Sequence, residues 1–146
     1  MAYCEQSDLN DVLTNDELIQ LTDDKNTGNI VTARITAAIA QADNLINSYC
    51  RAQHTISDWT GDDIPELIKD LSVRMTKYFL WKRRRKGQID EEIKNAYDND
   101  MKTLKGINKG DIKLEDAESF ANTGEIISSN KASTDKVYTS TELAKY

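Results

Sequence analysis

The chain has 146 residues, of which 38% are hydrophobic and 30% are charged, and its formal net charge is −6. This length predicts one domain whose core is large enough to fold without disulfides or a metal. One Pro and six Gly disfavour a turn-rich β-sandwich and favour long helices. No stretch approaches the roughly 18 apolar residues that a membrane-spanning helix needs, and the amino terminus lacks the features of a signal peptide. We therefore expect no membrane partner.

Charge is unevenly distributed along the chain. Residues 1–63 contain 3 Lys and Arg against 11 Asp and Glu, residues 64–109 contain 12 against 7, and residues 110–146 contain 4 against 7. The three segments therefore carry net charges of −8, +5 and −3. Two interpretations stay open. Oppositely charged helices pack side by side within one molecule, or separate copies meet with an acidic face against a basic face.

Two short helices are predicted near the amino terminus, over residues 7–13 and 15–21. Ser7 is a favourable N-cap for the first helix. Thr14 and Glu17 have the spacing of a capping box at the start of the second helix. The polar stretch that follows predicts a loop.

The loop beginning at Asp23 has the length of a calcium-binding loop and has Gly28 at its sixth position. Lys25 and Arg34, however, occupy positions where the ion requires oxygen ligands. We therefore expect no calcium site, and we assign Gly28 to a turn with positive φ before the next helix.

Three long amphipathic helices follow the loop. Apolar residues recur at spacings of three and four over residues 32–50, residues 64–86, and from residue 90 to Gly106. Gly87 and Gly106 mark the predicted ends of the second and third helices. The first helix is the clearest, with an apolar stripe formed by Ile35, Ala38, Ile39, Ala42, Leu45, Ile46 and Tyr49.

Residues 106–146 are rich in Asn, Ser, Thr, Gly and Lys and show no sustained apolar period. The sequence therefore predicts an all-α domain over residues 1–106, a small bundle of three long and two short helices. Residues 107–146 form a polar carboxy-terminal arm, which is either extended and able to form strands or disordered until it meets a partner.

Candidate catalytic and metal-binding groups are scarce. His54 lies near Ser57 and Asp58 in polar sequence, but adjacency in a loop does not make a catalytic set, so we favour a surface loop. Cys4 and Cys50 lack the spacing of zinc ligands, and we expect Cys50 to be a buried thiol. We expect no enzymatic activity, no metal site and no cofactor.

The densest charge run consists of five consecutive cations, Lys82, Arg83, Arg84, Arg85 and Lys86. Five adjacent cations are able to contact phosphates, but consecutive residues of a helix point all round its axis rather than along one face. We interpret the run as a solvated helix end or a protein-contact patch. Contact with nucleic-acid phosphates is kept as the alternative.

Several short phrases occur in an order that resembles the head–tail connector family of Mu-like phages and prophages. The phrases are DELIQLTD at residues 16–23, Thr27-Gly28, an Ala-rich helix that closes on DNLINSY at residues 43–49, and IPELI at residues 64–68. The resemblance covers about residues 3–105. The loop at residues 51–63 departs from it, because it lacks the Pro-rich character of many members.

This resemblance implies a small all-α adaptor without catalytic residues. It implies a structural subunit that assembles into a homo-oligomeric ring and contacts portal and tail-completion proteins. Such a subunit would be part of a virion assembled in the bacterial host cytoplasm. An acidic surface facing the channel would let DNA pass without specific binding, because like charges repel. The alternative is a DNA-contacting accessory module that uses the cations of residues 82–86.

Overall fold

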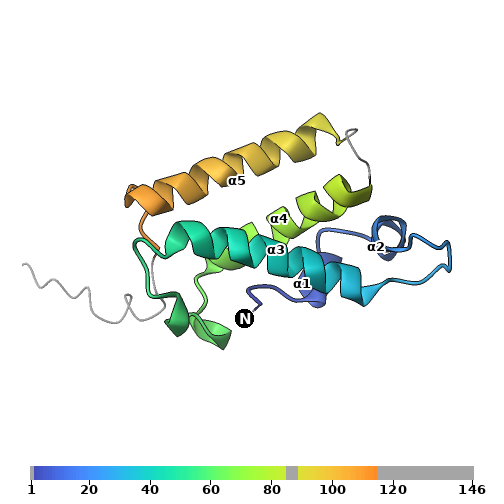
Figure 1. The fold of residues 1–146 in the computed structure, drawn as a ribbon, viewed down its shortest axis with the longest axis horizontal. Helices are drawn as coiled ribbons and strands as arrows, with labels where there is room; N and C mark the ends of the chain where they lie inside the picture. The colour runs from blue at the N-terminus through green and yellow to red at the C-terminus, as the bar shows by residue number, and fades with distance from the viewer. Residues whose placement is uncertain (1, 85–88, 115–146) are drawn as a thin grey trace, which may run out of the picture.

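A computed structural model of the chain describes residues 2–84 and 89–114. The described residues form five α-helices, two short 3-10 turns and no strand (Figure 1). This confirms the all-α prediction with three long and two short helices. The helices are α1 (Gln6–Asn10), α2 (Asn15–Thr22), α3 (Thr32–Cys50), α4 (Glu66–Arg84) and α5 (Glu91–Lys109). The 3-10 turns η1 (Ile56–Asp58) and η2 (Gly61–Asp63) lie between α3 and α4. No helix in this part of the chain is long and apolar enough to cross a membrane. The predicted arm from residue 115 on, and Gly87, lie outside the described residues.

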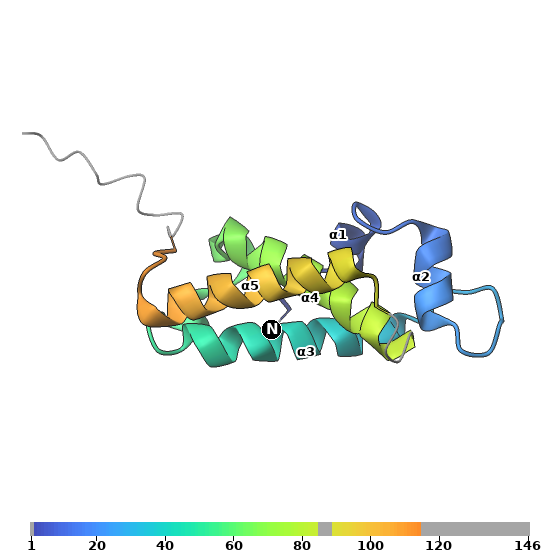
Figure 2. The same ribbon diagram turned by 90° about the horizontal axis from the view of Figure 1, so that it is seen from above.

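The long helices α3 and α4 pack against each other at the centre of the bundle, and α5 contacts both (Figure 1, Figure 2). Most of their apolar stripes are buried; the buried apolar residues are Ile35, Ala38, Ile39, Ala42, Ile46 and Cys50 in α3 and Ile68, Leu71, Met75, Phe79 and Leu80 in α4. Full burial of a Leu or Ile side chain contributes about 1.5–3 kcal/mol of transfer free energy. This apolar core therefore holds the three long helices together.

The end of α5 differs from the sequence prediction. The helix continues past Gly106 to Lys109, and Gly110 ends it with a φ of 80°. The N–H of Asp111 donates to the carbonyl of Gly106, and the N–H of Gly110 donates to that of Ile107, which is a Schellman motif. Gly106 serves close packing instead, since an added Cβ would lie 2.8 Å from Ile112 Cδ1. The extra turn also buries Ile107 completely.

Of the two caps predicted for the amino-terminal helices, one is confirmed and the other is wrong. Thr14 and Glu17 form the predicted capping box: the N–H of Thr14 donates to Glu17 Oε2 at 2.9 Å and the N–H of Glu17 to Thr14 Oγ1 at 3.3 Å. Helix α1, however, spans residues 6–10 instead of 7–13. Its cap is Glu5 rather than Ser7, because Asp8 accepts a hydrogen bond from the N–H of Glu5 at 2.7 Å.

A buried polar network attaches the amino-terminal segment to α3 and α4. Asp43, which is 3% exposed, accepts hydrogen bonds from the N–H of Tyr3 at 3.2 Å and from Ser72 Oγ at 2.7 Å. Ser72 Oγ also lies 3.2 Å from Cys4 Sγ, and the hydroxyl of Tyr3 donates to Asn47. Desolvation raises the pKa of Asp43, although its hydrogen bonds oppose this shift. Three distant parts of the chain thus meet at one carboxyl group.

A second polar contact joins α4 to α5. Arg74 Nε donates to Asp100 Oδ1 at 2.9 Å; the Asp100 side chain is 9% exposed and the Arg74 side chain 43%. Burial raises the pKa of Asp100, and the Arg74 guanidinium opposes the rise. Arg74 also lies 3.9 Å from Asp70, which is on the same helix and exposed.

Replacing Asp43 tests the buried network. In Asp43→Ala, the N–H of Tyr3 and the hydroxyl of Ser72 lose their acceptor, so we expect the free energy of unfolding to fall by about 1–3 kcal/mol. Urea denaturation followed by tryptophan fluorescence measures the change. The neighbouring Asn44 is exposed, and Asn44→Ala should cost less than about 0.5 kcal/mol. Equal losses in the two variants would contradict a structural role for Asp43.

Replacing Arg74 makes stability depend more steeply on pH. Arg74→Ala leaves the Asp100 carboxylate buried without its cation, which further raises the pKa of Asp100 and should cost about 1–3 kcal/mol at pH 8. Protonation removes the buried charge, so the loss should shrink as the pH falls from 8 toward 5. Denaturation at several pH values checks this, with Asp70→Ala as the exposed control. A loss that is independent of pH would contradict the assignment.

Candidate functional site

The described part of the basic run lies at the carboxy-terminal end of α4. The Arg83 guanidinium donates through one nitrogen to both carboxylate oxygens of Asp24, at 3.0 and 2.8 Å, and through the other to the carbonyl of Leu21. Arg84 donates to the same carboxylate at 3.0 Å. Arg85 and Lys86 lie outside the described residues.

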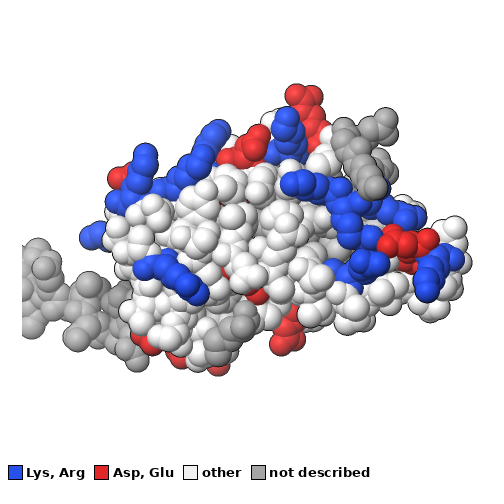
Figure 3. All heavy atoms as spheres, viewed as in Figure 1, with Lys and Arg blue, Asp and Glu red and all other residues white. Residues whose placement is uncertain are grey.

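Asp24 is the centre of a charged cluster with three arginines. Besides Arg83 and Arg84, the guanidinium of Arg34 lies 3.5 Å from its carboxylate. The hydrogen bond from Arg83 holds the pKa of Asp24 below its usual value, and the charges of the three arginines act in the same direction. At this end of the bundle, Figure 3 shows blue side chains around a red group. Here the acidic and basic segments of the sequence pair within one molecule, and the cluster keeps an excess of positive charge.

The loop before α3 positions Asp24. Asp23 is buried and accepts hydrogen bonds from the N–H of Gly28 at 2.7 Å and from that of Lys25 at 3.0 Å. Desolvation opposes the shift, but these backbone donors lower the pKa of Asp23. Gly28 has a φ of 76°, which confirms the predicted turn. Asp23 thus serves as an acceptor for its own loop, and the described residues contain no group of three His, Cys, Asp or Glu side chains placed to hold a metal.

Lys82 points to a different neighbour from the arginines. Its ammonium lies 5.8 Å from the centre of the Tyr78 ring, within the range of a cation–π contact. The Tyr78 ring in turn stacks on Tyr97 of α5, with centroids 3.8 Å apart and planes 10° apart. The three described cations of the run therefore serve two separate contacts, as expected for consecutive residues on a helix.

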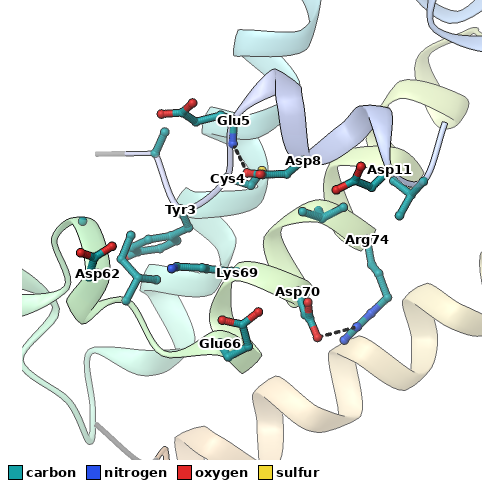
Figure 4. Close-up of a pocket in the computed structure, with 15 residues that line it drawn as sticks. Tyr3, Cys4, Glu5, Asp8, Asp11, Asp62, Glu66, Lys69, Asp70 and Arg74 are labelled. Atoms are coloured by element: carbon teal, nitrogen blue, oxygen red, sulfur yellow. Dashed lines mark hydrogen bonds and ion pairs between the residues drawn. The ribbon is translucent and has the colours of Figure 1, made fainter. Parts of the chain in front are cut away.

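A second surface is a groove between α1 and the beginning of α4, with a volume of about 700 Å³ (Figure 4). We call it the acidic groove, defined by its six carboxylates Glu5, Asp8, Asp11, Asp62, Glu66 and Asp70. Two cations line it, Lys69 and Arg74, and Arg74 is engaged with Asp70 and Asp100. Figure 4 shows Asp8 and Asp11 on one side and Glu66 and Asp70 on the other. The groove thus keeps a negative charge that internal pairs do not neutralise.

The groove was not visible in the sequence. Its carboxylates come from residues 5–11 and 62–70, which are separated by α2 and α3 and meet only because α1 packs on α4. The Asp24 cluster was missed for the same reason. Sequence signals existed for the buried groups alone: Asp43 interrupts the apolar stripe of α3 four residues after Ile39, at a position that faces the core.

The other candidate residues, His54, Ser57, Asp58 and the two cysteines, contact neighbouring residues of the fold. His54 is half-buried, and its ring centre lies 5.7 Å from that of Trp59. Ser57 Oγ donates to Asp58 at 3.1 Å, so these two side chains pair with each other. Both cysteines are buried, which confirms the expectation for Cys50, and burial raises the pKa of the Cys50 thiol to about 11.

Titration of Asp24 tests the charged cluster. Removing the strongest donor in Arg83→Gln should raise the pKa of Asp24 toward its usual value, and carbon-detected NMR of the carboxyl group measures the shift. Arg84→Gln is the matched control and should raise it less, because Arg83 makes the larger contribution. Equal pKa values in the parent protein and in Arg83→Gln would contradict the observed contact.

The comparisons with known proteins identify a family. The model of the family described as bacteriophage Mu, Gp36 matches residues 3–128. The match extends past the resemblance noted in the sequence and reaches into the predicted carboxy-terminal arm. No curated protein matches the chain. The match supports a role in phage structure or morphogenesis. Since it spans most of the sequence, this chain belongs to the bacteriophage Mu Gp36 family.

Proposed function

We propose that this protein is a structural head–tail connector subunit of a Mu-like phage or prophage. In this proposal, copies assemble into a homo-oligomeric ring that contacts the portal on one side and tail-completion proteins on the other. The subunit folds in the bacterial host cytoplasm, becomes part of the virion and has no catalytic activity.

The family match carries this proposal, because it assigns the chain to phage proteins over residues 3–128. The distribution of charge supports assembly from different faces. In Figure 3, red side chains lie along the lower edge of the bundle, whereas the opposite edge, where Figure 1 places α5, carries blue side chains mixed with red ones. A contact between two different faces of identical subunits is heterologous, and it forms a ring when its rotation closes.

The acidic surface of such a subunit would also affect how DNA passes through the channel. Where an acidic surface faces the channel, it repels phosphates, so DNA passes without specific binding. The alternative, a DNA-contacting module, depends on the cations of residues 82–86. Two of these, Arg83 and Arg84, already bind Asp24. That internal pairing favours the connector over the DNA-contacting module.

Assembly is the direct test of the proposal. Native mass spectrometry and negative-stain electron microscopy, over a range of protein concentrations and with the portal protein of the same genome, should show rings of one defined subunit number. A protein that stays monomeric under all these conditions and does not bind the portal would contradict the connector function.

Duplex DNA added to the same protein separates the two candidate functions. The connector should bind DNA weakly at low salt. The alternative expects tight binding whose logarithm falls linearly with the logarithm of the salt concentration. Tight, salt-sensitive binding that is lost when Lys82, Arg83 and Arg84 are replaced by Gln would favour the DNA-contacting module instead.

A further inference from the structure

Val12 is the large apolar side chain that remains exposed in the described part of the chain, with 42% of its surface accessible. The chain holds it outward, because the N–H groups of Val12 and Leu13 both donate to the carbonyl of Leu9, at 3.2 and 2.8 Å. Leu9 and Leu13 are buried on either side. Val12 lines the acidic groove, next to Asp11. A single exposed apolar side chain is common on protein surfaces, so Val12 gains its interest from its place at the acidic groove.

The opposite side of the bundle carries a complementary surface. Helix α5 has three exposed lysines near its end, Lys102, Lys105 and Lys109, which we call the lysine edge. Lys102 donates to Asn99 at 3.2 Å, and none of the three forms an ion pair with another described residue. Within this edge, the surface is hollowed beside Met101, and the hollow is otherwise lined by polar residues: Asn95, Asp98, Asn99, Lys102 and Lys105.

We propose that the acidic groove of one copy binds the lysine edge of a second copy, with Val12 inserted into the hollow beside Met101. The charges match in sign. Six carboxylates outnumber two cations in the groove, and the edge has three lysines without an ion-pair partner among the described residues, against Asp98 at the hollow. The shapes match in kind, since a projecting apolar side chain meets a hollow with a thioether at its wall. Opposite charges steer this contact and fix its register.

The arrangement of the helices makes this contact heterologous. Figure 1 shows α1 and α5 on different sides of the central helices, and the main contacts of each helix are with α3 and α4. A groove on α1 therefore cannot bind the lysine edge of its own chain. Each copy offers a groove to one neighbour and an edge to another, which is the geometry that builds a closed ring or an open filament. This inference rests on the proposed ring, for which it names the two surfaces.

Cysteine cross-linking tests the contact directly. Val12→Cys and Asn99→Cys place new thiols on the two surfaces, and both positions are exposed. The native Cys4 and Cys50 are buried, so the parent protein is the background control. Oxidation with copper phenanthroline should give disulfide-linked dimers when the two variants are mixed, and neither variant should dimerise alone. Dimers of Val12→Cys by itself would overturn the heterologous contact.

Charge reversal gives a second, independent measurement. Lys102→Glu with Lys105→Glu should weaken self-association by about tenfold or more at low salt. Adding Asp11→Lys and Asp62→Lys, two exposed positions of the groove, to the same chain should restore it. The matched control is Lys94→Glu, an exposed lysine of α5 outside the lysine edge, which should leave association unchanged. The assigned surfaces would be overturned if Lys94→Glu weakened self-association as much as the double reversal at Lys102 and Lys105. They would also be overturned if the groove substitutions did not restore association.

The outcomes separate this inference from the proposed function. Rings that form normally while the mixed cysteine variants give no cross-link would overturn the two surfaces and leave the connector function standing. A parent protein that does not associate with itself, with or without the portal, would overturn both.

Discussion

The packing of α3 against α4 is the constraint on which the rest of the structure depends. These two helices bury most of the apolar stripe of each, and every other helix of the described chain packs on at least one of them. The pair also encloses Asp43, whose carboxyl group binds Ser72 of α4 and the backbone of Tyr3. An apolar pair of helices is tolerant of small shifts, whereas a buried carboxyl group with two donors accepts one arrangement. The amino-terminal segment and α1 are placed by that arrangement, and the acidic groove is placed with them.

Charge is handled differently in different parts of the molecule. At one end, Asp24 gathers three arginines, so the basic run of α4 and the acidic front of the chain neutralise each other in part. At the α4–α5 contact, Arg74 compensates the buried Asp100. Along the groove, Asp70 pairs with Arg74, and its other carboxylates and the lysines in the last turns of α5 form no ion pair with another described residue. The structure thus shows the first interpretation of the uneven charge, pairing within one molecule, at Asp24. Contact between separate copies stays a proposal.

The family match and the surface charges are the two observations behind the proposed role in assembly. Several carboxylates of the molecule have local structural partners: Asp23 accepts hydrogen bonds from its own loop, Glu17 caps α2 and Asp58 accepts a hydrogen bond from Ser57. Membership of the bacteriophage Mu Gp36 family supports a role in phage structure or morphogenesis. A rigid helical core with charged surfaces on different sides is well suited to repeated contacts between identical copies, because each contact then has a defined direction.

The sequence by itself determined the helices. The spacing of apolar residues located α3 at its observed bounds, and the polar pattern at Thr14 and Glu17 predicted the cap of α2. These features depend on neighbours within one or two turns, so local chemistry decides them. Only the tertiary structure decided which glycine ends α5: Gly110 takes the left-handed cap, whereas Gly106 lies inside the helix where Ile112 leaves no room for a Cβ. It also decided the Asp24 cluster, the Asp43 network and the acidic groove. The residues of each group are distant in sequence and meet only through packing, and no local sequence pattern encodes that packing. For the same reason, the charge run at residues 82–86 could not reveal that Arg83 and Arg84 bind Asp24.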